Sequence, residues 1–523
     1  MQRPNFIVIM ADDMGYSDIG CYGSEIRTPH LDGMARRGLR FSQMYNAARC
    51  CPTRASLLTG LYPHQAGVGD MINPKGTSRA YQGYLAENTP TIAEVLRTRG
   101  YRNYYAGKWH ASPGLPIQGD PARELGSPTN PTPRSRGFDR FFGTLAGAGS
   151  FFNPHGLMDQ DRRVNAWEYD DFYYTDQISE RACTMIDEAA RDQQPFFLHV
   201  CYTAPHWPLH ARPETIETYR DTYHRGWDYF RTARHEALKG MGMLDARWPI
   251  SPRDPLSRDF KEDNAERRAW ESLRMAVYAA QIESMDAGIG RLLERLRAQG
   301  QEDNTYVLFL SDNGGCAEFL NEDGDGRSWP SFYRHSALPG ETCTVGNIPG
   351  LDPGPSTTFM SYDLPWANAS NAPFRLYKHW VHEGGIATPL VVQGPGISDP
   401  GGIVHHPCHI IDIMSTCVDA SGARHPDTFA GQPSVPLEGQ SLLPLLRGET
   451  PAEPRTLYWE HERNAAVREG CWKMVRQKRG PWELYNLEED RTELNNLVGG
   501  EKDRLRRLTA LYDSWAERVG VEE

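Results

Sequence analysis

Acidic side chains stand directly after two apolar segments that lie far apart in this sequence. Asp12 and Asp13 follow the first segment, and Asp312 and Asn313 follow the second. Three carboxylates and one amide, without Cys or His, suit a hard cation such as Ca²⁺ or Mg²⁺ and suit zinc poorly. Either pair alone is better explained by a turn or a helix cap. Two pairs, each directly after a strand-like segment, predict a metal site.

A reactive cysteine is predicted in the segment CCPTRASLLTG, residues 50–60. Pro52 suits the first turn of a helix, which places Cys50 at or just before the helix N-terminus. The free amides and the helix dipole favour an anion there, so a thiol at this place would be acidic and nucleophilic. The alternatives are a structural cysteine buried in a turn and a strained pair of Cys50 with Cys51.

Cationic and imidazole side chains occur in three further loops. The first contains Lys108 and His110, the second His206 and the third Lys378. Each of them alone is most simply a solvated surface residue. Together with Arg54 they would form a positive pocket for a tetrahedral oxyanion. Such a pocket is needed for an anionic substrate because the formal net charge of the chain is −12.

Composition limits the classes of protein that this chain can be. Acidic and basic residues are interleaved and form no basic patch, so we expect no nucleic-acid partner. We also expect no membrane association, because no apolar run is long enough to span a bilayer. No signal-peptide segment is recognisable, which predicts a cytoplasmic protein, or a periplasmic one if the chain was trimmed. The ten cysteines lack metal-type spacing and are expected to be mostly buried small hydrophobes.

The elements that must position these side chains alternate between strands and helices. Helices are expected to begin at Thr28-Pro29 and at Thr89-Pro90, and a long helix is expected over about 269–299. Apolar runs typical of strands buried on both faces occupy residues 5–10, 101–106, 195–202 and 306–310. Polar residues cluster where these strands end, which predicts an α/β sheet with the active site at its carboxyl edge.

The pattern changes after about residue 395, which divides the chain into an N-terminal catalytic domain, 1–395, and a C-terminal subdomain, 396–523. A short helix is expected over 409–418. Alternating segments then predict an antiparallel meander on which a terminal helix, 505–516, would pack. The meander strands are expected around residues 457–459, 466–475 and 482–484.

Residues 318–375 form a long segment rich in Gly, Pro and aromatic residues, which is expected to form a wall of the substrate pocket together with residues 111–160. Tyr362 and Trp366 are the candidate pocket residues, and their rings suit an aryl group and a sugar ring equally well. Residues 321–326 are similar to the start of a calcium loop. That interpretation fails because Phe332 stands where the bidentate Glu is required.

Cys-x-Pro-x-Arg followed by ASLLTG resembles the signature of the type I sulfatases of the alkaline phosphatase superfamily. The resemblance extends over essentially the whole chain. It is carried, in the order expected of bacterial arylsulfatase-like enzymes, by NFIVIMADDMGYSDIGCYG, RTPHLDGMARRGLRF, GKWH, APHWPLHA, FLSDNGG, YKHWVHEGGIATPL, HIIDIMSTCVDASG and ELYNLEEDRTELNNL. It implies a large, mixed, mostly parallel sheet between helices and a small C-terminal subdomain. It also implies hydrolysis of a sulfate monoester, such as an aryl sulfate, to an alcohol or phenol and inorganic sulfate.

The resemblance further implies that Cys50 is converted to formylglycine by a separate maturation enzyme and that its hydrate is the nucleophile. Cys50 and the four residues of the predicted metal site would hold a single Ca²⁺, with Mg²⁺ or Mn²⁺ less favoured. His110 would deprotonate the remaining hydroxyl of the sulfated intermediate and so release sulfate. The other cationic residues would bind sulfate oxygens or protonate the leaving alcohol, namely Arg54, Lys108, His206 and Lys378.

Two features leave alternatives open. The second position of the signature is Cys51, where Ser, Thr or Ala is more usual, and a second thiol could compete by forming a disulfide. Phosphonate monoester hydrolases and phosphodiesterases share the scaffold, but several of them use Asp-His where this chain has Asp312-Asn313. Lesser alternatives are a non-catalytic homologue and an unmodified Cys50 acting as a thiol nucleophile.

Overall fold

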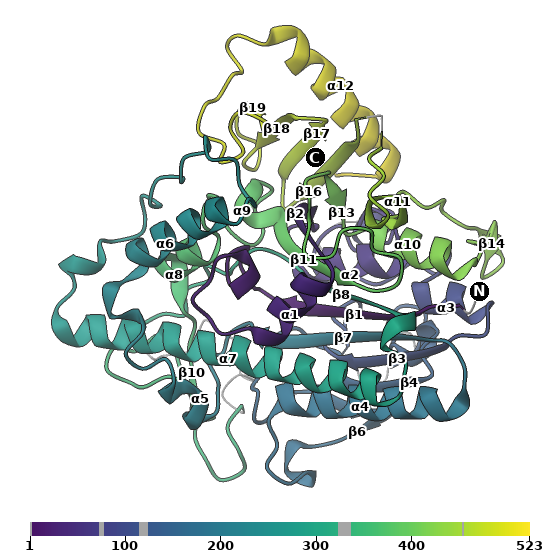
Figure 1. Ribbon diagram of the computed structural model, residues 1–523, viewed down its shortest axis with the longest axis horizontal. Coiled ribbons are helices and arrows are strands. Elements are labelled where there is room, and N and C mark those ends of the chain that lie inside the picture. Colours follow the sequence, from purple (N-terminus) through teal and green to yellow (C-terminus); the bar gives the residue numbers. More distant parts are fainter. Residues whose placement is uncertain (1–2, 73–77, 115–123, 323–335, 452–453, 523) are drawn as a thin grey trace.

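A large mixed sheet forms the centre of the molecule (Figure 1) in a computed structural model that describes residues 3–72, 78–114, 124–322, 336–451 and 454–522. Its order is β12-β2-β11-β8-β1-β7-β3-β4-β5-β6, with β13 also paired to β2. The strands are β1 (Asn5–Asp12), β2 (Leu39–Tyr45), β3 (Arg102–Gly107), β4 (Arg140–Thr144), β5 (Leu157–Asp159), β6 (Arg162–Arg163), β7 (Phe196–Pro205), β8 (Thr305–Ser311), β11 (Ala387–Gln393), β12 (Ile403–Val404) and β13 (Cys408–His409).

The middle of this sheet is parallel. Strand β1 lies between β7 and β8, and β3 and β4 continue the parallel arrangement beyond β7. On the other side, β11 pairs antiparallel with both β8 and β2. The predicted fold class, a mixed and mostly parallel sheet between helices, is confirmed.

Helices cover both faces of the sheet because its central strands are apolar on both faces. Ile7 and Ile9 of β1 pack into a core with helices α1, α4 and α7, whereas Phe6 and Val8 pack into a second core with α2, α3 and α10. The helices are α1 (Pro29–Arg37), α2 (Cys50–Thr59), α3 (Ile92–Arg97), α4 (Tyr174–Asp192), α5 (Pro213–Glu217), α6 (Trp227–Gly240), α7 (Ala265–Ala298), α8 (Asp363–Ser370), α9 (Glu383–Ile386), α10 (Asp412–Ser421), α11 (Leu443–Leu446) and α12 (Lys502–Val519).

Capping residues and a short strand explain why α3, α7 and α10 begin at residues other than those predicted. Helix α3 is capped by Thr91, which forms a capping box with Glu94, and not by Thr89. Helix α7 begins four residues earlier than expected, because Asn264 caps a polar first turn that carries no apolar signal. Helix α10 begins later than expected because His409 belongs to β13.

A separate four-stranded antiparallel sheet, with α12 packed on it, forms the C-terminal part at the top of Figure 1. This confirms the predicted antiparallel meander, but the predicted segment 466–475 is two paired strands and not one. The chain between residues 403 and 409 still pairs with β2 of the large sheet, and the domain boundary after residue 395 stays a prediction. The meander strands are β16 (Thr456–His461), β17 (Asn464–Glu469), β18 (Trp472–Arg476) and β19 (Glu483–Asn486).

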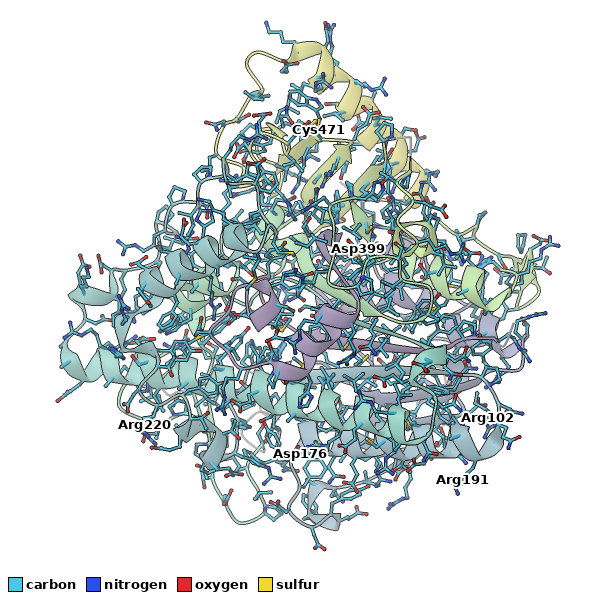
Figure 2. All side chains as sticks on the ribbon, viewed as in Figure 1. Arg102, Asp176, Arg191, Arg220, Asp399 and Cys471 are labelled. Atoms are coloured by element: carbon cyan, nitrogen blue, oxygen red, sulfur yellow. The ribbon has the colours of Figure 1, made fainter. Side chains whose placement is uncertain are left out.

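Charged side chains are abundant at the periphery, as Arg191 and Arg220 show in Figure 2. None of the helices within the described ranges has the length and apolar character needed to cross a bilayer. The catalytic candidates differ from these surface charges because they are buried at the carboxyl edge of the large sheet.

Candidate active site

The two acidic motifs meet because their strands are parallel neighbours. Ala11 of β1 pairs with Ser311 of β8, so Asp12 and Asp312 emerge at the same edge of the sheet. The backbone N–H of Asp13 donates to Oδ1 of Asp312 at 3.1 Å. Three carboxylates therefore converge in a place where none of them is more than 1% exposed.

The chemistry of this acidic cluster fits a bound divalent cation. Nδ2 of Asn313 donates to Oδ1 of Asp13 at 2.7 Å, whereas Oδ1 of Asn313 and Oδ1 of Asp12 are buried without a hydrogen-bond partner. Burial, together with the charge of Asp12, raises the pKa of Asp312 to about 8. Two buried oxygens without hydrogen-bond partners, among crowded carboxylates, suit the ligation of a hard divalent cation.

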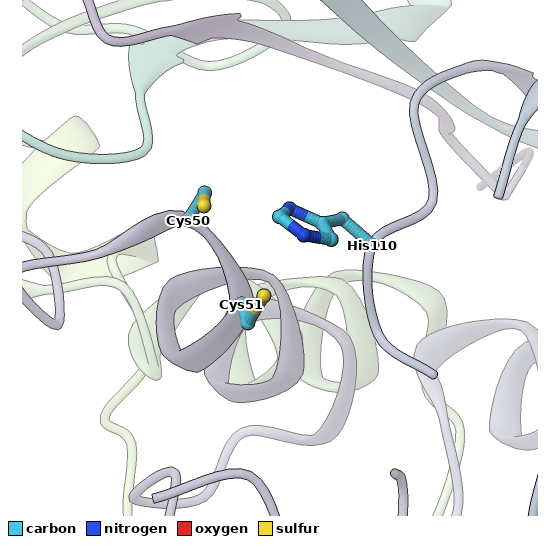
Figure 3. A group of neighbouring side chains, drawn as sticks. All are labelled: Cys50, Cys51 and His110. Atoms are coloured by element: carbon cyan, nitrogen blue, oxygen red, sulfur yellow. The ribbon is translucent and has the colours of Figure 1, made fainter. Parts of the chain in front are cut away.

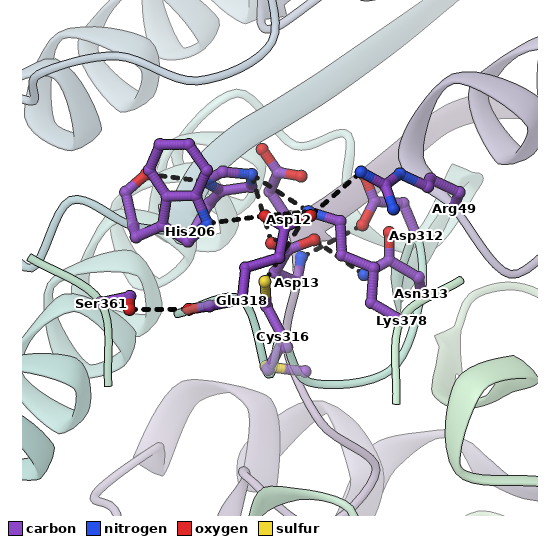
Figure 4. Close-up of polar contacts among 12 residues, drawn as sticks. Asp12, Asp13, Arg49, His206, Asp312, Asn313, Cys316, Glu318, Ser361 and Lys378 are labelled. Carbon is purple, nitrogen blue, oxygen red and sulfur yellow. Dashed lines mark hydrogen bonds and ion pairs between the residues drawn. The ribbon is translucent and has the colours of Figure 1, made fainter. Parts of the chain in front are cut away.

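Cationic and imidazole side chains lie beside the acidic cluster, and Figure 4 shows two of them, His206 and Lys378. Nζ of Lys108 donates to Oδ2 of Asp12 at 2.6 Å, and Nζ of Lys378 donates to Oδ2 of Asp13 at 2.8 Å. Nε2 of His206 lies 3.2 Å from the same Asp13 oxygen and 3.3 Å from Nζ of Lys378. The structure thus brings together three of the predicted sulfate-binding residues.

Arg54 supports the acidic cluster from helix α2. Its Nη2 donates to Oδ2 of Asp312 at 2.7 Å, and its Nη1 donates to the carbonyl oxygen of Lys108 at 2.8 Å. Burial acts to lower the pKa of Arg54, but the charges of Asp312 and Asp12 raise it well above its usual value. Arg54 is therefore a fixed charge that links the helix to both strand ends.

Cys50 is the first residue of α2, and its side chain is 2% exposed. Its thiol faces Cys51 and His110 (Figure 3), and the ligand atoms of these three residues lie within 4.8 Å of one another. The hydrogen bond from Cys51 lowers the pKa of Cys50 well below its usual range, with His110 and Lys108 acting in the same direction against burial. The predicted nucleophile thus lies at a buried helix N-terminus beside a histidine.

Comparison with known proteins agrees with this geometry. The family model described as sulfatase matches residues 4–423 of the chain. The chain belongs to the sulfatase family. A second model, described as N-sulphoglucosamine sulphohydrolase, C-terminal, matches residues 374–511. As a sulfatase, the protein is a hydrolase that cleaves a sulfate ester, and its family generally uses a formylglycine and a divalent metal ion.

Several relatives cover nearly the whole sulfatase. An uncharacterized sulfatase of Schizosaccharomyces pombe is 31% identical and covers 99% of this chain and 94% of the relative. The arylsulfatase of Klebsiella aerogenes is 34% identical, over 84% of this chain and 91% of the relative. The crystal structure of Ps i-CgsB superposes with a TM-score of 0.66 at 25% identity, over 98% of this chain and 93% of the other. A protein whose structure was solved with its substrate D-glucosamine-2-N,6-O-disulfate shares the fold. Its TM-score is 0.64 at 19% identity, over 100% of this chain and 99% of the other.

The backbone of the sulfatase is strained around the site. Asp13, Ala48, His110 and His379 all have positive φ, at 64°, 66°, 50° and 73°. Side chains larger than glycine rarely adopt this region, and such strain concentrates at functional sites. Gly147 packs so closely on His110 that a Cβ there would lie 2.5 Å from Cε1 of the imidazole. The orientation of His110 is therefore set by its own backbone and by this glycine.

Two site residues of the sulfatase escaped the sequence analysis. Glu318 accepts hydrogen bonds from Nε1 of Trp207 at 2.9 Å and from Nη2 of Arg49 at 3.0 Å, and it lies 3.6 Å from Nζ of Lys378. Although burial acts to raise the pKa of Glu318, the charges of Lys378 and Arg49 lower it. Arg49 directly precedes Cys50 and could have been found from that position. Nothing in the sequence marks Glu318.

The predicted pocket residues are corrected by the structure. Trp366 is fully buried in an aromatic cluster with Trp227, and its Nε1 donates to the carbonyl oxygen of Glu271 at 3.0 Å. Tyr362 is 3% exposed and stacks on Tyr278 at 4.3 Å. Both belong to the hydrophobic core, and α8, which carries Trp366, packs against α6. The pocket-wall segments and the rejected calcium loop extend into residues 115–123 and 323–335, which lie outside the described residues.

Proposed function

We propose that this sulfatase uses formylglycine derived from Cys50 as its nucleophile and a single Ca²⁺ as its metal. The observation that supports this most strongly is the convergence of Asp12, Asp13, Asp312 and Asn313, two of them with orphaned oxygens, beside the N-terminus of α2. A calcium ion bound there would supply positive charge to the reacting sulfate group and to the nucleophile. Four oxygen donors without nitrogen or sulfur favour Ca²⁺ over a transition metal.

The cationic residues would bind the sulfate group. Lys108, His206 and Lys378 all approach the metal-site carboxylates closely, so their N–H groups converge where sulfate oxygens would replace some of these contacts. His206 and Lys378 are also placed to protonate the leaving oxygen. Burial lowers the pKa of His206 to about 4, which makes Lys378 the charged member of this pair at neutral pH.

His110 would act at the nucleophile. Its Nδ1 is buried without a hydrogen-bond partner, and burial lowers its pKa to about 4. A neutral imidazole beside the Cys50-derived hydroxyl can accept a proton in the step that releases sulfate. Arg54 would keep the charges of Asp12 and Asp312 balanced through both steps.

Mass spectrometry of the Cys50 peptide tests the nucleophile. We expect a mass that shows conversion to the aldehyde, in proportion to the activity on 4-nitrophenyl sulfate, and a loss of all activity in Cys50→Ala. Cys471→Ser, which changes a half-buried cysteine in the turn between β17 and β18, is the control and should keep full activity. Fully active enzyme with an intact Cys50 thiol would contradict the proposal. Preparations made with and without a co-expressed formylglycine-generating enzyme test the proposed maturation partner.

Metal analysis and a substrate panel test the rest. We expect one Ca²⁺ per chain, and activity that is lost on chelation and restored by Ca²⁺ better than by Mg²⁺ or Mn²⁺. By analogy with the arylsulfatase of Klebsiella aerogenes, we propose aryl sulfates as substrates. Alkyl sulfates, sulfated sugars and an aryl phosphonate are the comparison arms. Faster turnover of the phosphonate would favour a phosphonate monoester hydrolase instead.

A further inference from the structure

A second group of potential metal ligands lies outside the catalytic centre. One ligand atom from each of Asp70, His461 and Glu462 lies within 4.8 Å of the other two. Asp70 belongs to the loop that follows α2, whereas His461 ends β16 and Glu462 begins the turn to β17. The group therefore joins the catalytic part of the chain to the C-terminal sheet.

His461 is the unusual member of this group. Its side chain is 0% exposed, and neither Nδ1 nor Nε2 has a hydrogen-bond partner. An unsatisfied buried polar group costs about 1–3 kcal/mol, so a ligand bound to the imidazole of His461 would stabilise the folded protein. Burial lowers the pKa of His461, which leaves the imidazole neutral and able to coordinate a metal ion at neutral pH.

The hairpin that presents Glu462 is strained. His461 pairs with Asn464, and the two residues between them, Glu462 and Arg463, both have positive φ, at 49° and 70°. Two-residue turns of this kind favour Asn-Gly because larger side chains are strained there. A strained turn persists when the surrounding structure stabilises it, and it frequently marks a functional position.

We propose that Asp70, His461 and Glu462 bind a divalent transition-metal ion, with Zn²⁺ as the representative, at a second site distinct from the catalytic one. One imidazole and two carboxylates match zinc ligation, which leaves a fourth position for water. Ligand atoms bound to a tetrahedral zinc ion at about 2.0–2.2 Å lie about 3.3–3.6 Å apart. The three ligand atoms lie within 4.8 Å of one another, so binding requires them to approach by at most about 1.5 Å.

The position of this site connects it to the catalytic centre. Oε2 of Glu462 lies 3.2 Å from Nδ1 of His379, and Nδ2 of Asn464 donates to the carbonyl oxygen of His379 at 3.2 Å. His379 directly follows Lys378, and its backbone N–H donates to the carbonyl oxygen of Ala48 at 2.8 Å. A bound ion would therefore hold the hairpin against the segment that carries Lys378.

Calorimetric titration of Zn²⁺ into chelator-treated enzyme, with excess Ca²⁺ present to fill the catalytic site, tests the proposal. We expect one Zn²⁺ per chain with a dissociation constant below about 1 µM, and weakening of at least tenfold in both His461→Gln and Asp70→Asn. His425→Gln, which removes an imidazole elsewhere in the C-terminal half, is the control and should bind as the wild type does.

Anomalous diffraction at the zinc edge identifies the site, with a peak expected between His461 and Asp70. Absence of Zn²⁺ binding, unchanged binding in Asp70→Asn, or a peak only at Asp12 and Asp13 would overturn the proposal. Asp70→Asn decides the matter if His461→Gln does not fold. Because the readouts are stoichiometry and position, they are independent of whether Cys50 is the nucleophile.

Discussion

His206 and Lys378 share the carboxylate of Asp13 and lie 3.3 Å apart, so two potential proton donors face one region of the site. Lys108 contacts a different carboxylate, that of Asp12. A proton donor to the leaving oxygen and a residue that only binds sulfate have different kinetic effects. The requirement for a proton depends on the leaving group, whereas the binding of sulfate does not.

We predict that Lys378→Ala lowers kcat/KM by about 10²–10⁴-fold for an alkyl sulfate and by a smaller factor for 4-nitrophenyl sulfate. The reason is that nitrophenolate leaves without a proton, whereas an alkoxide does not. Rates across a series of leaving groups measure this difference as a steeper dependence on leaving-group pKa. Lys108→Ala is the control and should lower all rates by a similar factor. If Lys378→Ala lowered kcat/KM by the same factor for the alkyl sulfate and for 4-nitrophenyl sulfate, Lys378 would be assigned to sulfate binding alone.

The orientation of His110 depends on Gly147, because a Cβ at this position would lie 2.5 Å from the imidazole. We predict that Gly147→Ala lowers kcat by about 100-fold, since a displacement of about 1 Å at a catalytic group has an effect of that size. Gly149→Ala is a matched control in the same loop, because its nearest neighbour would be 3.6 Å away, an ordinary contact. Steady-state kinetics of the two variants distinguish the effect. Equal activities would show that Gly147 does not position His110.

At the scale of elements, a buried ion-pair network joins α9 to the C-terminal sheet. Oε1 of Glu383 lies 2.9 Å from Nζ of Lys473 in β18, and Oε2 lies 2.9 Å from Nε of Arg491. All three side chains are fully buried. Burial acts to raise the pKa of Glu383, but the charges of Lys473 and Arg491 lower it to about 2.

We predict that Glu383→Gln lowers the free energy of unfolding at pH 7 by about 3 kcal/mol, because it leaves Lys473 and Arg491 buried with less compensation. Because the folded-state pKa is depressed, the contribution of Glu383 is complete above its unfolded value of 4.5 and is lost as the pH falls towards about 2. The difference between wild type and variant should therefore shrink below pH 4.5 in urea unfolding curves. Glu489→Gln, which changes an exposed ion pair with Arg247, is the control and should have little effect. A difference that is independent of pH would contradict this account.

At the scale of the whole molecule, the sequence revealed what depends on local pattern. The apolar runs of β1 and β8 were recognisable because both faces of these strands are buried, and the acidic residues were recognisable because they end those strands. Edge strands such as β12 and β13 have only two residues each, too few to show a period.

Long-range pairing of polar residues was not predictable. Glu318 and Glu383 are ordinary acidic residues in the sequence, and only the fold shows which cations they meet. Trp366 was misinterpreted for a related reason, because an aromatic residue in a loop-rich segment suits a pocket wall and a core equally well. Side chains at the catalytic centre were predictable since parallel strand ends bring them together whatever lies between them in the sequence.

The burial of α2 has a consequence for how the protein is made. Cys50 is 2% exposed in the folded chain, and Lys378 and β11, which complete this edge of the sheet, are synthesised about 330 residues after it. At about 5–20 residues per second, the ribosome needs roughly 15–65 s to reach them. We therefore expect the proposed conversion of Cys50 to occur on the nascent chain, before this edge of the sheet is complete. The speed of translation would then affect the fraction of enzyme molecules that carry formylglycine.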